Sequence, residues 1–147
     1  MENSDLKKDL PVIDSCFNLL DIKDILSESP KLFLYFSQNN CLPCIEYALT
    51  EISNLSISEI KECVYILANV ENPREYSILL DNYNYKGMVY FINEMPLNCG
   101  KLDEKPFFFI LTNNFNPHLI FVPEKTIPEF SECYFQTIEE ILNSRSP

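Results

Sequence analysis

The sequence predicts an α/β protein made of one domain, and three observations support this. Short runs of consecutive apolar residues, which suit strands buried on both faces, alternate with segments whose apolar residues recur every three or four positions, as in amphipathic helices. Of the 147 residues 46% are hydrophobic, so the chain can bury a sizeable core without disulfide crosslinks. It contains no low-complexity tract or linker. We expect a single domain (1–147) with an N-terminal extension (1–30) and a core (31–145).

The first core strand and the helix after it flank a Cys-x-x-Cys motif. Residues Leu32–Phe36 are continuously apolar and follow Pro30, as expected for a central strand. The motif, Cys41-Leu42-Pro43-Cys44, comes next, and Pro43 falls in the first helical turn, where its missing N–H costs nothing. The residues at helical spacing after the motif are Ile45, Ala48, Leu49, Ile52 and Leu55. The predicted order is therefore strand, motif, helix.

Further strands and helices follow in the same alternation. The expected strands are Val64–Val70, Met88–Ile92, Phe107–Leu111 and His118–Val122. A helix beginning at Pro73 separates the first two, and a turn at Asn113–Pro117 makes a hairpin of the last two. A terminal helix is expected over Tyr134–Asn143. In the extension, Val12–Leu20 suits a short strand or hairpin arm, and Asp21 precedes a short helix.

The motif carries the chemistry that the sequence predicts. A thiolate at a helix N-terminus can accept hydrogen bonds from unpaired backbone N–H groups and faces the positive end of the helix dipole, so its ionised form is favoured. Cys41 is then the nucleophile. Cys44, one helical turn away, can attack a mixed disulfide formed on Cys41 and release the reduced substrate. The sequence therefore predicts dithiol–disulfide exchange.

Composition argues against several other functions. The two glycines, Gly87 and Gly100, cannot build a glycine-rich phosphate loop. A net charge of −11 opposes binding to nucleic acid. No apolar stretch approaches the roughly 18–20 residues that cross a bilayer. We expect no cofactor, no metal, no nucleic-acid partner and no membrane span, while the oligomeric state stays open.

The N-terminus gives an expectation about the compartment. It is polar and acidic and lacks the apolar region of a secretory signal, which predicts a cytoplasmic protein. The periplasm or cell envelope is the alternative if the chain is a trimmed part of an exported protein. The six cysteines do not decide between these locations.

Three features together resemble the thioredoxin fold: the order of elements, the motif at the entry to the helix after the central strand, and Pro106 directly before an apolar strand. The resemblance covers Phe17 to Asn143. The 65 positions from Cys41 to Pro106 exceed a minimal thioredoxin and are similar to TlpA-like and peroxiredoxin-like bacterial thiol-disulfide oxidoreductases. The resemblance implies a three-layer sandwich with a mixed sheet of about five strands flanked by helices. It also implies an inserted α–β element between the motif helix and Pro106.

The resemblance also implies a binding site and partners. In this family the proline lies against the disulfide after a cis peptide bond, and the backbone there pairs with an extended substrate segment. The corresponding residues are Lys105 and Pro106, with Leu42 and Pro43 beside them. The implied partners are a protein disulfide substrate and a reductase or oxidant that resets the motif.

The sequence departs from the family at two places. Asn40 stands where the family commonly has Trp, and Tyr35 stands where many thioredoxins carry a buried acid that assists proton transfer. No Lys, Arg or His lies near the motif in sequence, and Glu46 opposes thiolate formation. The helix terminus must then supply most of the activation, and catalysis is expected to be slow.

Other interpretations of the same residues stay open. The alternative function is a non-catalytic thioredoxin-fold binding module with a relic motif, which recognises a partner through the loop Asn93–Lys105. The cysteines could instead be structural or hold zinc, although one Cys-x-x-Cys supplies only two ligands. A peroxidase is disfavoured because Gln38 occupies the place of the expected Thr. Of the remaining side chains, His118 is expected at the surface and Cys133 in the interior.

Overall fold

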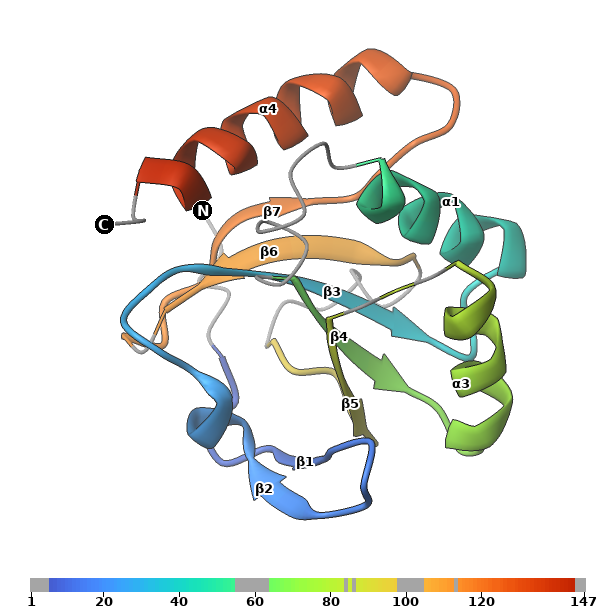
Figure 1. The fold of residues 1–147 in the computed structure, drawn as a ribbon, viewed down its shortest axis with the longest axis vertical. Helices are drawn as coiled ribbons and strands as arrows, with labels where there is room; N and C mark the ends of the chain where they lie inside the picture. Colours follow the sequence, from blue (N-terminus) through green and yellow to red (C-terminus); the bar gives the residue numbers. More distant parts are fainter. Residues whose placement is uncertain are drawn as a thin grey trace.

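A computed structural model describes residues 6–54, 64–83, 85, 87–97, 105–112 and 114–144 (Figure 1). The strands are β1 (Pro11–Ile13), β2 (Leu19–Asp21), β3 (Lys31–Ser37), β4 (Val64–Asn69), β5 (Met88–Ile92), β6 (Phe107–Leu111) and β7 (His118–Phe121). The helices are the 3₁₀ helix η1 (Ile22–Ile25), α1 (Leu42–Ser53), α3 (Pro73–Asn82) and α4 (Pro128–Ser144). The predicted α/β class is confirmed, and α3 with β5 forms the α–β element expected between the motif helix and Pro106.

The strands form one mixed sheet in the order β2-β1-β5-β4-β3-β6-β7. The three central strands β3, β4 and β5 are parallel, while β1, β2, β6 and β7 pair antiparallel with their neighbours. Parallel pairing places the carboxyl ends of β3, β4 and β5 at one edge of the sheet. The Cys-x-x-Cys motif follows β3 at that edge.

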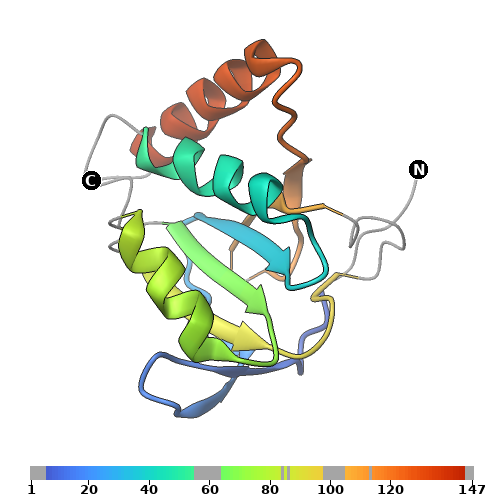
Figure 2. The ribbon, with the colours of Figure 1, turned by 90° about the vertical axis from the view of Figure 1, so that its right-hand side faces the viewer.

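Both faces of the central strands are buried, which explains their uninterrupted apolar sequence. In β3, Leu34 and Phe36 join one core with residues of α1, α3 and α4, while Phe33 and Tyr35 point to a second core. Figure 2 shows these three helices on the same side of the sheet. The apolar stripe of α1 packs on that side, with Ile45, Ala48, Leu49 and Ile52 buried. The predicted residue Leu55 lies outside the described residues.

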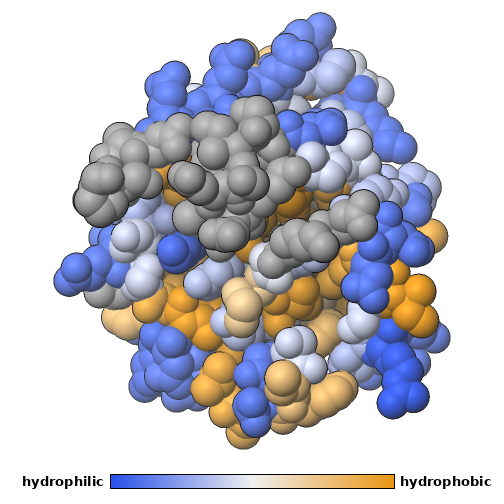
Figure 3. Space-filling view, viewed as in Figure 1, coloured by the Kyte–Doolittle hydropathy of each residue, from blue (hydrophilic) through white to orange (hydrophobic). Residues whose placement is uncertain are grey.

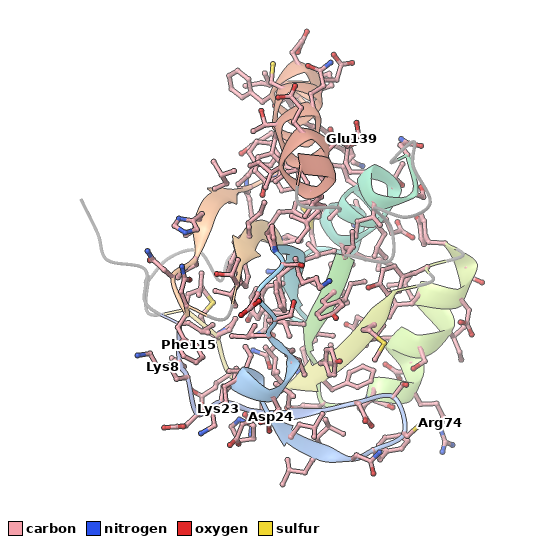
Figure 4. All side chains as sticks on the ribbon, turned by 60° about the vertical axis from the view of Figure 1, so that its left-hand side comes forward. Lys8, Lys23, Asp24, Arg74, Phe115 and Glu139 are labelled. Atoms are coloured by element: carbon pink, nitrogen blue, oxygen red, sulfur yellow. A yellow bond between two sulfur atoms is a disulfide. The ribbon has the colours of Figure 1, made fainter. Side chains whose placement is uncertain are left out.

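The described N-terminal residues before β2 and the helix η1 cover the second face of the sheet. Val12, Ile22 and Ile25 are buried there against β3, β4 and β6. The ammonium of Lys8 lies 5.2 Å from the ring centroid of Phe115, which tethers the segment to the loop before β7 (Figure 4). The N-terminal extension is thus part of the packed domain.

Within the described residues the sheet has seven strands, so the expectation of about five was too low. The extra pair comes from Val12–Leu20, which forms a hairpin in which Val12 pairs with Leu20. The carboxylate of Asp14 accepts the backbone N–H groups of Cys16 and Asn18, each at 2.9 Å, and closes the turn. Phe17 takes a φ of 65° at the tip. The hairpin extends the sheet beyond β5.

Candidate functional site

The two cysteines of the motif are joined as a disulfide at the start of α1. Their Cα atoms lie 5.3 Å apart. Cys41 is the N-cap residue, and its Sγ accepts a hydrogen bond from the backbone N–H of Cys44 at 3.3 Å. Cys41 is exposed and Cys44 is partly buried. This arrangement has two features that exchange requires, because the first cysteine is an exposed residue and the second is within bonding reach.

The loop between β3 and the motif is fixed by side-chain hydrogen bonds. Asn40 is buried, and its Oδ1 accepts the backbone N–H of Ser37 at 2.7 Å. The side-chain Oε1 of Gln38 accepts a hydrogen bond from the backbone N–H of Glu71 at 2.6 Å. The backbone N–H of Gln38 donates to the carbonyl of Asn69 at 3.0 Å. Asn40 therefore closes a tight turn in front of Cys41. The loop is joined to the end of β4.

Replacing Asn40 with alanine should destabilise this turn. The substitution removes the acceptor of a buried N–H, and we expect a loss of about 1–3 kcal/mol in the free energy of unfolding. Denaturant titration of the oxidised protein measures it. Asn39→Ala is the matched control, because Asn39 is exposed and its described hydrogen bond uses only the backbone, so its effect should stay within about 0.5 kcal/mol. Equal effects of the two substitutions would contradict the role given to Asn40.

A pocket of about 200 Å³ opens beside the disulfide. Its first wall is the start of α1, its second is the dipeptide Lys105-Pro106, and its third is the segment 123–126 between β7 and α4. The lining residues from α1 are Pro43, Cys44 and Tyr47. The structure thus brings together four of the six residues singled out from the sequence. Of the other two, Cys41 is bonded to Cys44, and Leu42 is 52% exposed and outside the pocket lining.

The predicted cis bond before Pro106 is wrong. Among the described residues no peptide bond is cis, so Lys105 and Pro106 are joined by a trans bond. Trans is the lower-energy isomer for any X–Pro bond unless the surroundings select cis. Pro106 is buried at the pocket wall and Lys105 is exposed.

Charged and polar groups that are distant in sequence meet in or next to this pocket. Lys105 Nζ lies 3.3 Å from Oε1 of Glu124, and Lys125 lines the same pocket. The hydroxyl of Tyr47 lies 3.4 Å from Oγ of Ser131 on α4, and burial raises the pKa of Tyr47. Sequence reasoning named Lys105 but missed Tyr47, Glu124, Lys125 and Ser131, because it considered only charges close to the motif along the chain. The only available signal was a lysine directly before Pro106.

The position of the expected buried acid holds a neutral side chain. Tyr35 is fully buried in β3, and its hydroxyl accepts a hydrogen bond from Nδ2 of Asn69 at 3.0 Å. Its ring lies 5.1 Å from that of Phe107. No carboxylate occupies this position.

The remaining candidate ligands do not gather in the described part of the chain. Within it, no group of three or more His, Cys, Asp or Glu residues could hold a metal ion. His118 is exposed at the start of β7, as expected. Cys133 is exposed on α4, so its predicted burial is wrong: it lies on the solvent side of that helix. Cys63 and Cys99 lie outside the described residues. Within the same part, no helix is both long and apolar enough to span a bilayer.

No family model and no curated protein sequence matches the chain. Solved structures match along nearly all of it. A putative thiol:disulfide interchange protein DsbE from Chlorobium tepidum has a TM-score of 0.65 at 15% identity, covering 97% of this chain and 99% of that one. The thioredoxin domain of a thiol-disulfide oxidoreductase from Bacteroides vulgatus gives 0.63 at 8% identity, covering 97% and 99%. A peroxiredoxin-like protein from Aquifex aeolicus gives 0.58 at 9% identity, covering 92% and 87%.

These similarities concern the fold, because the identities are too low to carry an activity from one protein to another. They agree with the element order, the mixed sheet and the helix that starts at the Cys-x-x-Cys motif. The resemblance seen in the sequence is thereby confirmed. The chain is a protein of the thioredoxin fold.

Proposed function

We propose that the chain is a thiol-disulfide oxidoreductase that exchanges the Cys41/Cys44 pair with the disulfide of a protein or small molecule. The observation that carries the proposal is the placement of Cys41. The residue is exposed at the helix N-terminus, and its Sγ accepts a hydrogen bond from the backbone N–H of Cys44 and is bonded to the Sγ of Cys44. A pair of merely structural cysteines would have no need of an exposed sulfur. The similar solved structures include proteins described as thiol-disulfide oxidoreductases.

The proposed reaction starts from the reduced pair. The Cys41 thiolate attacks one sulfur of the substrate disulfide, forming a mixed disulfide and releasing the first substrate thiolate. The thiolate of Cys44 then attacks Cys41, which releases the second substrate thiol and leaves the Cys41–Cys44 disulfide that the structure shows. Two electrons pass to the substrate. A partner reductase restores the dithiol, or an oxidant restores the disulfide if the reaction runs in reverse.

The substrate is proposed to lie across the pocket beside Cys44. The dipeptide Lys105-Pro106 and the start of α1 face each other there. A chain laid along Lys105-Pro106 would bring its disulfide to the exposed sulfur of Cys41. Leu42, half exposed next to that sulfur, would contact the substrate from the other side.

A Cys44→Ser variant tests the proposal by trapping the intermediate. Without the resolving thiol, the mixed disulfide on Cys41 should accumulate, because nothing within the protein displaces the substrate. The variant is reduced, incubated with a disulfide-bonded protein such as insulin, and analysed by non-reducing electrophoresis and mass spectrometry. The Cys41→Ser/Cys44→Ser double variant is the control and should form no adduct. Absence of an adduct in the single variant would contradict the proposed function.

The alternative binding function has one observation in its favour. Figure 3 shows apolar surface in the lower part of the molecule, where the β1–β2 hairpin lies. Ile13, Phe17 and Leu19 of this hairpin are exposed, and an apolar groove of about 280 Å³ adjoins it. The loop Asn93–Lys105, which was expected to bind a partner, lies mostly outside the described residues. A binding module would keep its function in the double variant, whereas an oxidoreductase would lose it.

A further inference from the structure

The pocket beside the disulfide carries more positive than negative charge. Three of its described lining residues are charged: Lys105, Glu124 and Lys125. Lys105 and Glu124 form an ion pair in which both side chains are about half exposed. No ion pair joins Lys125 to another described residue. Among the described lining residues, one positive charge is therefore left over.

This local excess contrasts with the charge of the whole chain, which is −11. Three other described cations are engaged away from the pocket. Lys7 pairs with Glu94, Lys23 lies 3.4 Å from Asp9, and Lys8 lies over Phe115 (Figure 4). Exposed charges are largely screened beyond about 8 Å at physiological salt, so a bound group senses mainly the charged residues that line the pocket, Lys105, Glu124 and Lys125. The pocket differs in sign from the protein as a whole.

The size and lining of the pocket limit what it can hold. At about 200 Å³ it is smaller than the roughly 300–1,000 Å³ of typical small-molecule sites. It suits one side chain of a polypeptide that passes the disulfide. Pro43, Tyr47 and Pro106 contribute apolar walls, and the lysines provide donors for an anionic group. A side chain that ends in a carboxylate satisfies both.

We propose that Lys105 and Lys125 make the protein selective for polypeptide disulfides that carry an acidic side chain next to the reactive cysteine. The inference rests on the proposed thiol-disulfide exchange and names the substrate class of that site. Lys125 receives the carboxylate directly. Lys105 contributes to the selectivity indirectly, through its ion pair with Glu124. The pair neutralises Glu124, which would otherwise attract a basic side chain of the substrate.

Single-turnover kinetics with short peptides test this selectivity. The full chain is reduced, freed of reductant, and mixed at about 0.15 M ionic strength with symmetric peptide disulfides in which Glu, Ser or Lys flanks the single cysteine. Each rate is divided by the rate of the same peptide with dithiothreitol, which corrects for the effect of the flanking charge on the peptide's own sulfur. The Glu peptide is expected to react about fivefold faster than the Lys peptide, the upper range for an exposed ion pair.

Three variants assign the effect to its residues. Lys125→Gln should bring the Glu-to-Lys rate ratio close to one. Lys105→Gln, which leaves Glu124 unpaired beside Lys125, should also bring the ratio close to one. Lys31→Gln is the matched control, because it changes the net charge by the same amount as the other two substitutions. Lys31 is the first residue of β3, and the strand extends roughly 20 Å from there toward the motif. Its ratio should equal that of the unmodified chain.

The outcomes separate this inference from the function on which it rests. Exchange with all peptides at equal corrected rates would overturn the selectivity and leave the oxidoreductase standing. The selectivity would also be overturned if Lys31→Gln lowered the Glu-to-Lys rate ratio as much as Lys125→Gln does. The effect would then come from the net charge of the chain and not from the pocket. No exchange with any peptide would overturn both.

Discussion

A Cys41→Ser variant is expected to lose disulfide exchange by at least about 10³-fold. The serine hydroxyl stays protonated at neutral pH and forms no bond to a substrate sulfur, so the hydrogen bond that the backbone N–H of Cys44 donates at the N-cap has no thiolate to stabilise. The remaining thiol, Cys44, is partly buried and lacks that position at the end of the helix. Reduction of insulin or of glutathione disulfide by the pre-reduced protein measures the loss.

The chain offers its own control for this experiment. Cys133 is an exposed free thiol on α4, far along the chain from the motif. Cys133→Ser removes a thiol of similar accessibility and should leave the exchange rate unchanged. If Cys133→Ser lowered the rate as much as Cys41→Ser, general thiol reactivity would account for the activity, and the helix-terminal placement of Cys41 would not matter.

Replacing Phe108 with alanine should have the largest effect on stability. Phe108 lies in β6, is 0% exposed, and packs its ring edge-on against Phe135 of α4 at 5.0 Å between centroids. The substitution removes buried apolar surface and leaves a cavity between the sheet and the helix, which costs about 3–5 kcal/mol. That is a large part of the roughly 5–15 kcal/mol of a typical domain. Denaturant titration of the oxidised protein measures the change.

Phe130→Ala is the matched control for this prediction. It is the same substitution on α4, but the side chain is 57% exposed, so its cost should stay within about 0.5 kcal/mol. If both variants unfolded at the same denaturant concentration, the packing of α4 on β6 would contribute little to stability. Near-ultraviolet circular dichroism would show whether the helix still docks in the Phe108 variant.

The core strands could be predicted because burial on both faces leaves a continuous apolar run. Leu32–Phe36 was expected as a strand and forms the inner part of β3, all of it buried. The hairpin strands β1 and β2 have three residues each and are half exposed, so no such run marks them. The helix α4 begins at Pro128, earlier than expected, because its first residues are mostly exposed and carry no apolar stripe.

The site was predictable only where it depends on local geometry. The spacing of Cys41 and Cys44 places both at one helical turn, and the disulfide follows from that spacing. The third wall of the pocket, at 123–126, lies about eighty residues after the motif in the sequence. A pattern of neighbouring residues cannot predict a contact between segments so far apart. The isomer of the bond before Pro106 depends on the packing around it, which sequence alone does not state.

The outer edges of the sheet bear on whether a second chain could pair with it. A sheet edge offers unpaired N–H and C=O groups to any passing strand, and long flat edges promote aggregation. Here the N-terminal hairpin covers the free side of β5, so the edge becomes β2, which is three residues long and ends in Asp21. On the opposite side, β7 pairs through a register shift and carries Leu119 at a φ of 52°. Neither border presents a straight template on which a second chain could extend the sheet.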